Sequence, residues 1–132
     1  MKKYNFDSNM DCKFCEIIKN KEFLIENDLA VAFYDSYPVS VGHALIIPKR
    51  HVETYFDLSE EEIKAMLSLS KEMKKIIDDK YHPDGYNVGF NVDEAGGQTV
   101  FHAHMHIIPR YKGDIENPRG GIRKIIKMKT NY

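Results

Sequence analysis

Short apolar runs, separated by turn-forming residues, fill the first half of the chain. Two of them, at 23–25 and 29–34, predict strands joined by a turn at 26–28, because the intervening Glu-Asn-Asp favours a turn. A third run, four aliphatic residues between Gly42 and Pro48, predicts a buried strand that the proline ends. A short helical pattern precedes these strands.

The longest periodic segment predicts a helix from Glu60 to about Asp79. Ser59 can cap its N-terminus, and Glu62 lies three residues later, where a capping box needs an acidic side chain. Charged residues lie opposite an apolar stripe at helical spacing, so we expect the stripe to pack in the core rather than to bind a cofactor. The stripe consists of Ile63, Met66, Leu67, Ser70, Met73 and Ile77.

Two further strands are predicted after this helix, at 86–92 and 99–108, with a glycine-containing loop at 93–98 between them. Pro109 is expected to end the second of these strands. Short strands, one long helix and a further strand pair indicate an α+β fold. We therefore expect a mainly antiparallel, five-stranded sheet with one long helix and one or two short ones.

The last predicted strand carries a histidine at every second position, at His102, His104 and His106, and the residues between them are apolar. Because side chains alternate between the faces of a strand, the three imidazoles should point to one face. One alternative is a solvated polar face, and another is a single zinc ion held by all three. The outer two histidines would lie about 13 Å apart at about 3.3 Å per residue, so three ligands cannot easily converge on one ion. Separate roles are expected for them.

A histidine row of this kind favours nucleophilic catalysis, because a neutral imidazole can attack phosphorus or a carbonyl near pH 7. Flanking histidines can bind an anionic group or fix the tautomer of the middle one. The preceding loop contains Gly96 and Gly97, which allow backbone N–H groups to approach a phosphate. A glycine pair is also common in ordinary hairpin loops, but beside the histidines it suggests an oxyanion cradle.

The composition excludes some function classes. The chain has 132 residues, the size of one domain, and a formal net charge of -1. This balance gives no reason to expect a nucleic-acid polymer or an anionic membrane as a partner. No apolar run approaches about 18 residues, and residues 1–11 are polar, so neither a membrane span nor a secretion signal is predicted. We expect a cytoplasmic location.

The cysteines, Cys12 and Cys15, are separated by two residues. In a reducing compartment this spacing suggests half of a zinc site or a redox pair rather than a structural disulfide. The alternative is two small buried residues at the start of a helix. The spacing by itself leaves these possibilities open.

The segment 102–108, in which three histidines alternate with apolar residues, resembles the signature of the histidine triad (HIT) superfamily of nucleotide hydrolases and transferases. The resemblance implies a HIT-like fold over 1–132, with a core at about 12–110 and a C-terminal tail at 111–132. Relatives are typically homodimers, so a homodimer is expected. The other segments that are similar to the family are 12–18, which resembles the Hint branch, 33–35, 42–51, Asn91 and 96–100.

The resemblance implies the catalytic residues. His104 would attack the α-phosphorus of a nucleotide and form a nucleotidyl-histidine intermediate that water then cleaves. His106 and the backbone of 97–99 would hold the phosphate oxygens, and His102 completes the catalytic triad.

The resemblance also implies the residues around a purine nucleotide. The carboxylate of Asp35 would accept hydrogen bonds from the ribose, apolar side chains would form a slot for the base, and Asn91 and His43 would lie beside the phosphates. The side chains of Gln98 or Thr99 would lie near the leaving group. The full nucleotide-binding set is Phe14, Ile17, Phe33, Asp35, His43, Asn91, Gly97, Gln98 and Thr99.

A zinc site is implied by similarity to bacterial relatives and to the galactose-1-phosphate uridylyltransferases, which use two cysteines and two histidines. A Cys₂His₂ set closes a tetrahedral coordination shell and suits a structural Zn²⁺ ion. Such an ion would hold the triad strand against the N-terminal segment. The matching residues are Cys12, Cys15, His51 and His102.

The resemblance leaves the substrate open. The segment 109–114 is similar to the Fhit-like and bacterial dinucleoside polyphosphate hydrolases, which favours release of AMP from compounds of the diadenosine tetraphosphate type. The cysteine segment favours the Hint-type alternative, hydrolysis of adenosine 5'-phosphoramidate. Arg110, Lys112 and Arg119 would contact polyphosphate, or else belong to a solvated tail. A nucleotide-binding regulatory or adaptor protein with vestigial activity is the alternative from another class.

Overall fold

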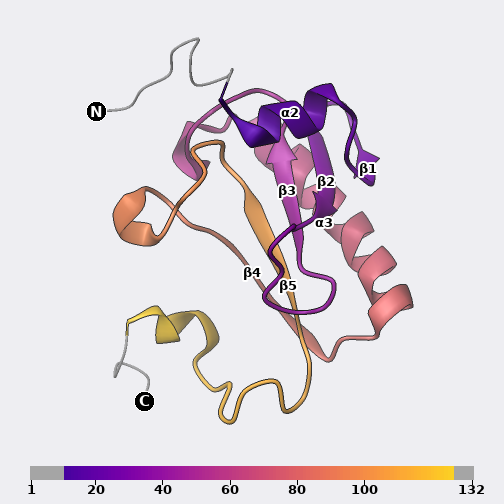
Figure 1. Ribbon diagram of the computed structural model, residues 1–132, viewed down its shortest axis with the longest axis vertical. Helices are drawn as coiled ribbons and strands as arrows, with labels where there is room; N and C mark the ends of the chain where they lie inside the picture. Colours follow the sequence, from indigo (N-terminus) through magenta and orange to yellow (C-terminus); the bar gives the residue numbers. More distant parts are fainter. Residues whose placement is uncertain (1–10, 127–132) are drawn as a thin grey trace.

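The computed structural model describes residues 11–126 and contains a five-stranded antiparallel sheet with a helix packed against each face (Figure 1). The predicted α+β fold is confirmed; residues 1–10 and 127–132 of the expected single domain lie outside the described part. In chain order the elements are α2 (Lys13–Lys19), β1 (Ile25–Glu26), β2 (Ala30–Tyr34), β3 (Ala44–Pro48), η1 (Tyr55–Asp57), α3 (Glu60–Tyr81), β4 (Gly85–Phe90), η2 (Glu94–Gly96), β5 (Met105–Arg110) and η3 (Gly121–Ile125).

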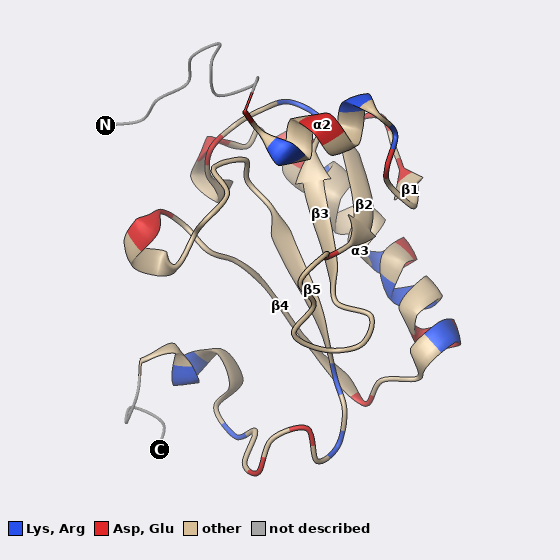
Figure 2. Ribbon diagram, viewed as in Figure 1, with Lys and Arg blue, Asp and Glu red and all other residues tan. Residues whose placement is uncertain are grey.

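The strand order is β1-β2-β3-β5-β4, and every neighbouring pair is antiparallel. Because side chains alternate along a strand, β3 sends Ala44 and Ile46 to one face and Leu45 and Ile47 to the other. The first face packs against α3, and the second packs against Phe14 of α2. Strands β2 and β3 carry no charged residue, as Figure 2 shows by their uniform tan colour.

Helix α3 begins as its sequence predicts. The hydroxyl of Ser59 accepts a hydrogen bond from the Glu62 amide at 3.1 Å, and the Glu62 carboxylate accepts one from the Ser59 amide at 2.8 Å, which completes the capping box. The predicted stripe is wrong at Leu67, which is 49% exposed, whereas Leu69 is fully buried. The buried face follows steps of three and four residues from Met66, and Leu67 lies about 100° away from it around the helix.

Strand β5 is shorter than predicted and is shifted along the chain. It spans Met105–Arg110 instead of 99–108, and β3 pairs with it only at 105–107. His102 and His104 therefore precede the strand, and the prediction that all three histidines belong to it is wrong for these two. The ring of His104 nevertheless stays next to that of His106, with centroids 5.0 Å apart. Pro109 is tolerated inside the strand because β5 has only β4 as a partner there.

The remaining predicted strands differ from the observed ones only at their ends. Strand β1 covers Ile25–Glu26 instead of 23–25, and β4 covers Gly85–Phe90 instead of 86–92. Among the helices that the structure describes, none has the length and apolar character needed to span a membrane.

Candidate functional site

A pocket of about 230 Å³ opens on the α2 side of the sheet, where side chains from α2, β2, β3 and β5 meet the loop after β4. His104 and His106 lie in this pocket with their ring centroids 5.0 Å apart. The lining residues are Lys13, Phe14, Ile17, Phe33, Asp35, Ser36, Tyr37, Leu45, Asn91, Gly97, Thr99, Val100, His104 and His106.

The local geometry of His104 gives it a nucleophilic nitrogen. Its Nδ1 lies 2.9 Å from the carbonyl oxygen of His102. Because a carbonyl oxygen only accepts hydrogen bonds, Nδ1 carries the proton and Nε2 keeps its lone pair. Burial lowers the pKa of His104, although the bond to the His102 carbonyl opposes this effect. The ring is therefore a neutral imidazole at pH 7.

His106 lies on β5 and contacts a second buried histidine. Its Nδ1 is 3.0 Å from Nε2 of His43, and the same Nε2 is 3.5 Å from a carboxylate oxygen of Asp35. Burial lowers the pKa of His43 and of His106. His106 and Asp35 thus form the polar end of the pocket, and the neutral His43 contacts both of them from behind.

The other end of the pocket is apolar. Phe14 and Phe33 pack edge to face with their centroids 5.7 Å apart, and Phe14 also packs edge-on against His104 at 5.1 Å. Ile17 adds to the same surface.

The cationic group of Lys13, which sequence reasoning missed, lies 5.5 Å from the ring of Tyr37 at this end. Its position one residue before Phe14 in the first turn of α2 is the sequence signal that points to it.

The loop after β4 contributes less to the pocket than predicted. The amides of Gly97 and Gln98 donate to carbonyls of the loop itself, at 2.9 and 3.0 Å, so they do not form the expected cradle. The side chain of Gln98 is buried and bonds to the Glu53 and Val100 carbonyls, so it closes the loop and does not line the pocket. Thr99 and Asn91 remain as the loop's polar lining residues with Gly97, whose φ of 92° shapes the turn.

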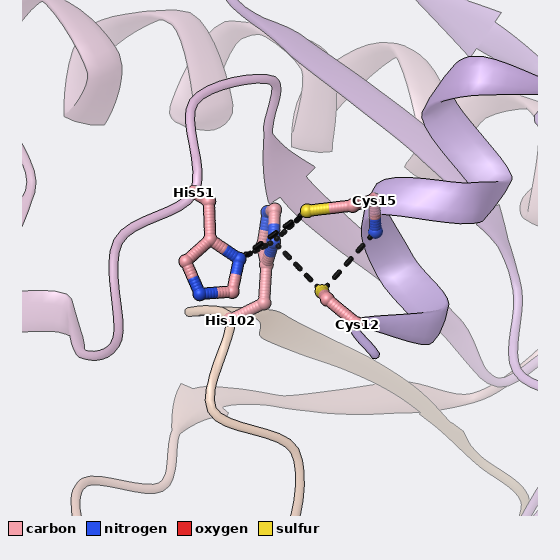
Figure 3. Close-up of side chains that lie close together, drawn as sticks. All are labelled: Cys12, Cys15, His51 and His102. Carbon is pink, nitrogen blue, oxygen red and sulfur yellow. Dashed lines mark hydrogen bonds between the residues drawn. The ribbon is translucent and has the colours of Figure 1, made fainter. Parts of the chain in front are cut away.

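A second cluster lies behind the pocket, where Cys12, Cys15, His51 and His102 converge from three segments of the chain (Figure 3). Their four ligand atoms all lie within 4.8 Å of one another. The His51 and His102 Nδ1 atoms are 3.2 Å apart, and His102 Nδ1 is 3.4 and 3.5 Å from the two sulfur atoms. The cluster thus unites all four residues that the sequence predicts as metal ligands.

These separations match a tetrahedral zinc site. Bond lengths of about 2.05 Å to nitrogen and about 2.3 Å to sulfur place two nitrogen ligands about 3.3 Å apart, and nitrogen and sulfur about 3.6 Å apart. His102 Nε2 also donates to the Pro48 carbonyl at 2.8 Å, which leaves Nδ1 with a lone pair. Burial lowers the pKa of His102 to about 4, so the ring is neutral at pH 7. The donor set and its spacing fit Zn²⁺.

Most of the predicted nucleotide-binding residues reach the pocket. Phe14, Ile17, Phe33, Asp35, Asn91, Gly97 and Thr99 line it together with His104 and His106. Three predicted residues do not line it: Gln98 supports the loop, His43 lies behind His106, and His102 belongs to the Cys/His cluster.

Fold and site together define an α+β protein with a pocket built around two neutral histidines. Residues 18–113 match the HIT domain, so the chain belongs to the HIT domain family, whose members are nucleotide hydrolases and transferases.

Similar proteins support this assignment. The adenosine 5'-monophosphoramidase hnt1 of Schizosaccharomyces pombe is 41% identical over 104 residues, which cover 76% of this chain and 75% of that protein. The adenylylsulfatase HINT3 of Arabidopsis thaliana is 37% identical over 79% of this chain, and the match spans 54% of that protein. A crystal structure of a Zn-bound histidine triad family protein from Mycobacterium smegmatis is 32% identical with a TM-score of 0.73, covering 80% of this chain and 79% of that one.

Proposed function

We propose that this chain is a nucleotide hydrolase that releases AMP through a nucleotidyl-histidine intermediate on His104. The observation that carries the proposal is the 2.9 Å contact between Nδ1 of His104 and the His102 carbonyl oxygen, which leaves Nε2 as a nucleophile in the pocket. Asp35 and the apolar slot suit a ribose and a purine base at positions that bring the α-phosphate toward His104.

The reaction has two displacements. Nε2 of His104 attacks the α-phosphorus, the bond from phosphorus to the leaving group breaks, and the leaving group takes a proton from solvent. Water then attacks the phosphorus and loses a proton to solvent, the bond to Nε2 breaks, and AMP leaves with neutral His104 restored. His106 stabilises the phosphate oxygens in both steps, since donors aimed at developing charge lower the barrier most.

We propose a phosphoramidate as the preferred substrate. The yeast relative is a phosphoramidase by name and the plant relative an adenylylsulfatase, so both names describe AMP joined to a small leaving group. The end of β5 supports this choice, because Arg110 is bound to both carboxylate oxygens of Asp114 at 2.7 and 2.8 Å and to Asn87 at 2.6 Å. Its guanidinium is thus engaged away from the pocket.

A dinucleoside polyphosphate is the second candidate, and Lys13 is the observation that favours it. This lysine lines the pocket and is a suitable partner for additional phosphates. On this hypothesis Lys13→Ala lowers kcat/KM for diadenosine tetraphosphate at least tenfold more than for adenosine 5'-phosphoramidate. An equal effect on both compounds excludes that role of Lys13.

The test compares the wild type and His104→Ala on adenosine 5'-phosphoramidate and diadenosine tetraphosphate, with AMP release followed by chromatography. We expect wild-type turnover, fastest with the phosphoramidate, and a loss of about 10³-fold or more in the variant. Equal turnover by both proteins refutes the nucleophile. Tight AMP binding without turnover of either compound favours a regulatory or adaptor protein instead.

We further propose that Cys12, Cys15, His51 and His102 hold a structural Zn²⁺ ion, which would fasten the N-terminus of α2 to the segment before β5. Support comes from the donor spacing and from the zinc-bound relative. Metal analysis of untagged protein prepared without chelator should find about one zinc per chain, and Cys15→Ser should reduce this content. Wild-type protein without zinc contradicts the proposal.

The assembly and location are proposals of the same kind. Strand β4 is an edge of the sheet and exposes Val88, which suits pairing of two copies of a single domain into a homodimer. Light scattering should then give about twice the chain mass of 15.4 kDa. The thiol ligands need a reducing compartment, which supports a cytoplasmic location.

A further inference from the structure

His43 is a buried histidine behind the pocket, only 3% exposed. It follows a tight turn in which its amide donates to the Ser40 carbonyl at 3.2 Å. Gly42 has a φ of 91°, and a Cβ there would approach a Tyr81 ring carbon to 2.9 Å, so the turn depends on glycine. The turn fixes His43 relative to the preceding Val39.

The backbone decides which nitrogen of His43 carries the proton. The Val39 amide lies 3.1 Å from Nδ1 of His43. An amide N–H only donates, so Nδ1 must accept, and the proton of the neutral ring must lie on Nε2. The Asp35 carboxylate oxygen at 3.5 Å from Nε2 supports the same tautomer, because it can only accept.

This tautomer then fixes His106. Nε2 of His43 and Nδ1 of His106 are 3.0 Å apart, so a single proton lies between them. That proton belongs to His43, and His106 must accept through Nδ1. Its own proton is therefore on Nε2. His104, by contrast, donates through Nδ1 to a carbonyl, so the two pocket histidines have opposite tautomers.

We propose that His43, oriented by the Val39 amide, is a positioning residue that holds His106 as a hydrogen-bond donor toward the pocket. Its effect on catalysis rests on the proposed function, in which a phosphate oxygen accepts that bond. Asp35, His43 and His106 also form a set of three potential metal ligands within 4.8 Å. The hydrogen-bond chain argues against a cation there, because a metal would need the lone pair of Nε2 of His43, which is protonated.

The decisive measurement is the tautomer of each histidine, read from side-chain ¹⁵N chemical shifts of the ¹⁵N-histidine-labelled protein without substrate. We expect His106 to be protonated at Nε2 in the wild type. Val39→Pro removes the donating amide at a position whose side chain is 73% exposed, and His43→Leu removes the donor to His106 while retaining bulk. Both variants should give His106 shifts averaged between the two tautomers.

The control is Val41→Pro, which introduces a proline into the same turn. Val41 precedes a glycine with positive φ, a turn position that proline favours, and it is 61% exposed. This variant should keep the wild-type shifts and turnover. In Val39→Pro and His43→Leu we expect kcat to fall by about 10- to 100-fold with a smaller change in KM, since one donor to a developing charge is lost.

The two parts of the test fail separately. A wild-type His106 protonated at Nδ1, or an unchanged His106 tautomer in Val39→Pro, overturns the positioning role whatever the activity. Absence of turnover in the wild type refutes the proposed function but leaves the tautomer result to be judged independently. In a third outcome, the wild type shows a single His106 tautomer and both variants show averaged shifts, but kcat stays unchanged. That outcome contradicts the catalytic part of the inference.

Discussion

The ion pair between Arg50 and Glu62 joins the start of α3 to the segment that carries His51, and its removal should be costly. The Glu62 side chain is 5% exposed and accepts hydrogen bonds from Arg50 Nε at 2.9 Å, from Arg50 Nη2 at 2.7 Å and from the Ser59 amide at 2.8 Å. The substitution Glu62→Ala removes all three bonds at once.

The expected loss follows from these contacts. Removal of the helix-capping bond costs about 1 kcal/mol, and hydrogen bonds to a charged group contribute about 1.5–3 kcal/mol. The Arg50 side chain is 58% exposed, so in the variant its guanidinium is hydrated by water, which reduces the loss of stability from the broken ion pair. We therefore expect Glu62→Ala to lower the free energy of unfolding by about 2–3 kcal/mol. This corresponds to a decrease in Tm of about 6–12 °C for a domain of this size.

The pH dependence gives an independent check. The bonds from Arg50 lower the pKa of the Glu62 carboxyl, and burial opposes this effect. A carboxyl whose pKa is lowered in the folded state stabilises the protein fully above its unfolded pKa of about 4.3, and the contribution disappears as pH falls through the folded pKa. The difference between wild type and Glu62→Ala should thus be full at pH 7 and shrink below about pH 4.

The assay is urea unfolding of the wild type, Glu62→Ala, Arg50→Ala and the double variant, at pH 7 and at about pH 3.5. The double-mutant cycle should give a coupling energy of about 1–2 kcal/mol. Glu61→Ala is the matched control, because Glu61 is an exposed acidic residue in the same helical turn. The reasoning is refuted if Glu62→Ala costs no more than this control, or if its effect grows on acidification.

Three further substitutions test the core and the turn beside the site. Leu69→Ala should cost about 2–5 kcal/mol of unfolding free energy because the side chain is fully buried, whereas Leu67→Ala should cost less than about 1 kcal/mol; similar losses in urea unfolding would contradict the observed helix face. Gly42→Ala should cost about 1–2 kcal/mol because of its positive φ, and it should lower kcat by displacing His43; a variant with wild-type stability and turnover would show that the turn is not strained by a side chain.

The sequence was sufficient to predict features that depend on residue type and local spacing. The capping box of Ser59 and Glu62 was predictable because both partners lie within one helical turn. The Cys/His cluster was predictable by resemblance, because related proteins use two cysteines and two histidines at the matching positions as metal ligands. The strands of the sheet were predictable because their short apolar runs lack the helical spacing of apolar residues that marks the long helix.

Features that depend on contacts between distant segments were not predictable from the pattern. The residues at 99–104 have the alternation of a strand, but β3 does not pair with them, and His102 instead turns toward the cysteines. Gln98 lies in the loop that was expected to bind phosphate. Its side-chain amide instead donates to the carbonyl of Glu53, 45 positions earlier in the chain. Only the folded structure reveals such partners.

The triad makes the same point in chemical terms, because its three identical residues differ only in what their ring nitrogens contact. His102 donates from Nε2 to the Pro48 carbonyl and keeps a lone pair on Nδ1, toward the cysteines. His104 donates from Nδ1 to a carbonyl and keeps a lone pair on Nε2, whereas His106 accepts on Nδ1 from His43. Two of these partners are backbone carbonyls, and the third is a histidine whose own tautomer is set by a backbone amide. These backbone groups keep their donor or acceptor character under most substitutions, proline excepted, so the different tautomers of the three histidines follow from the path of the chain around them.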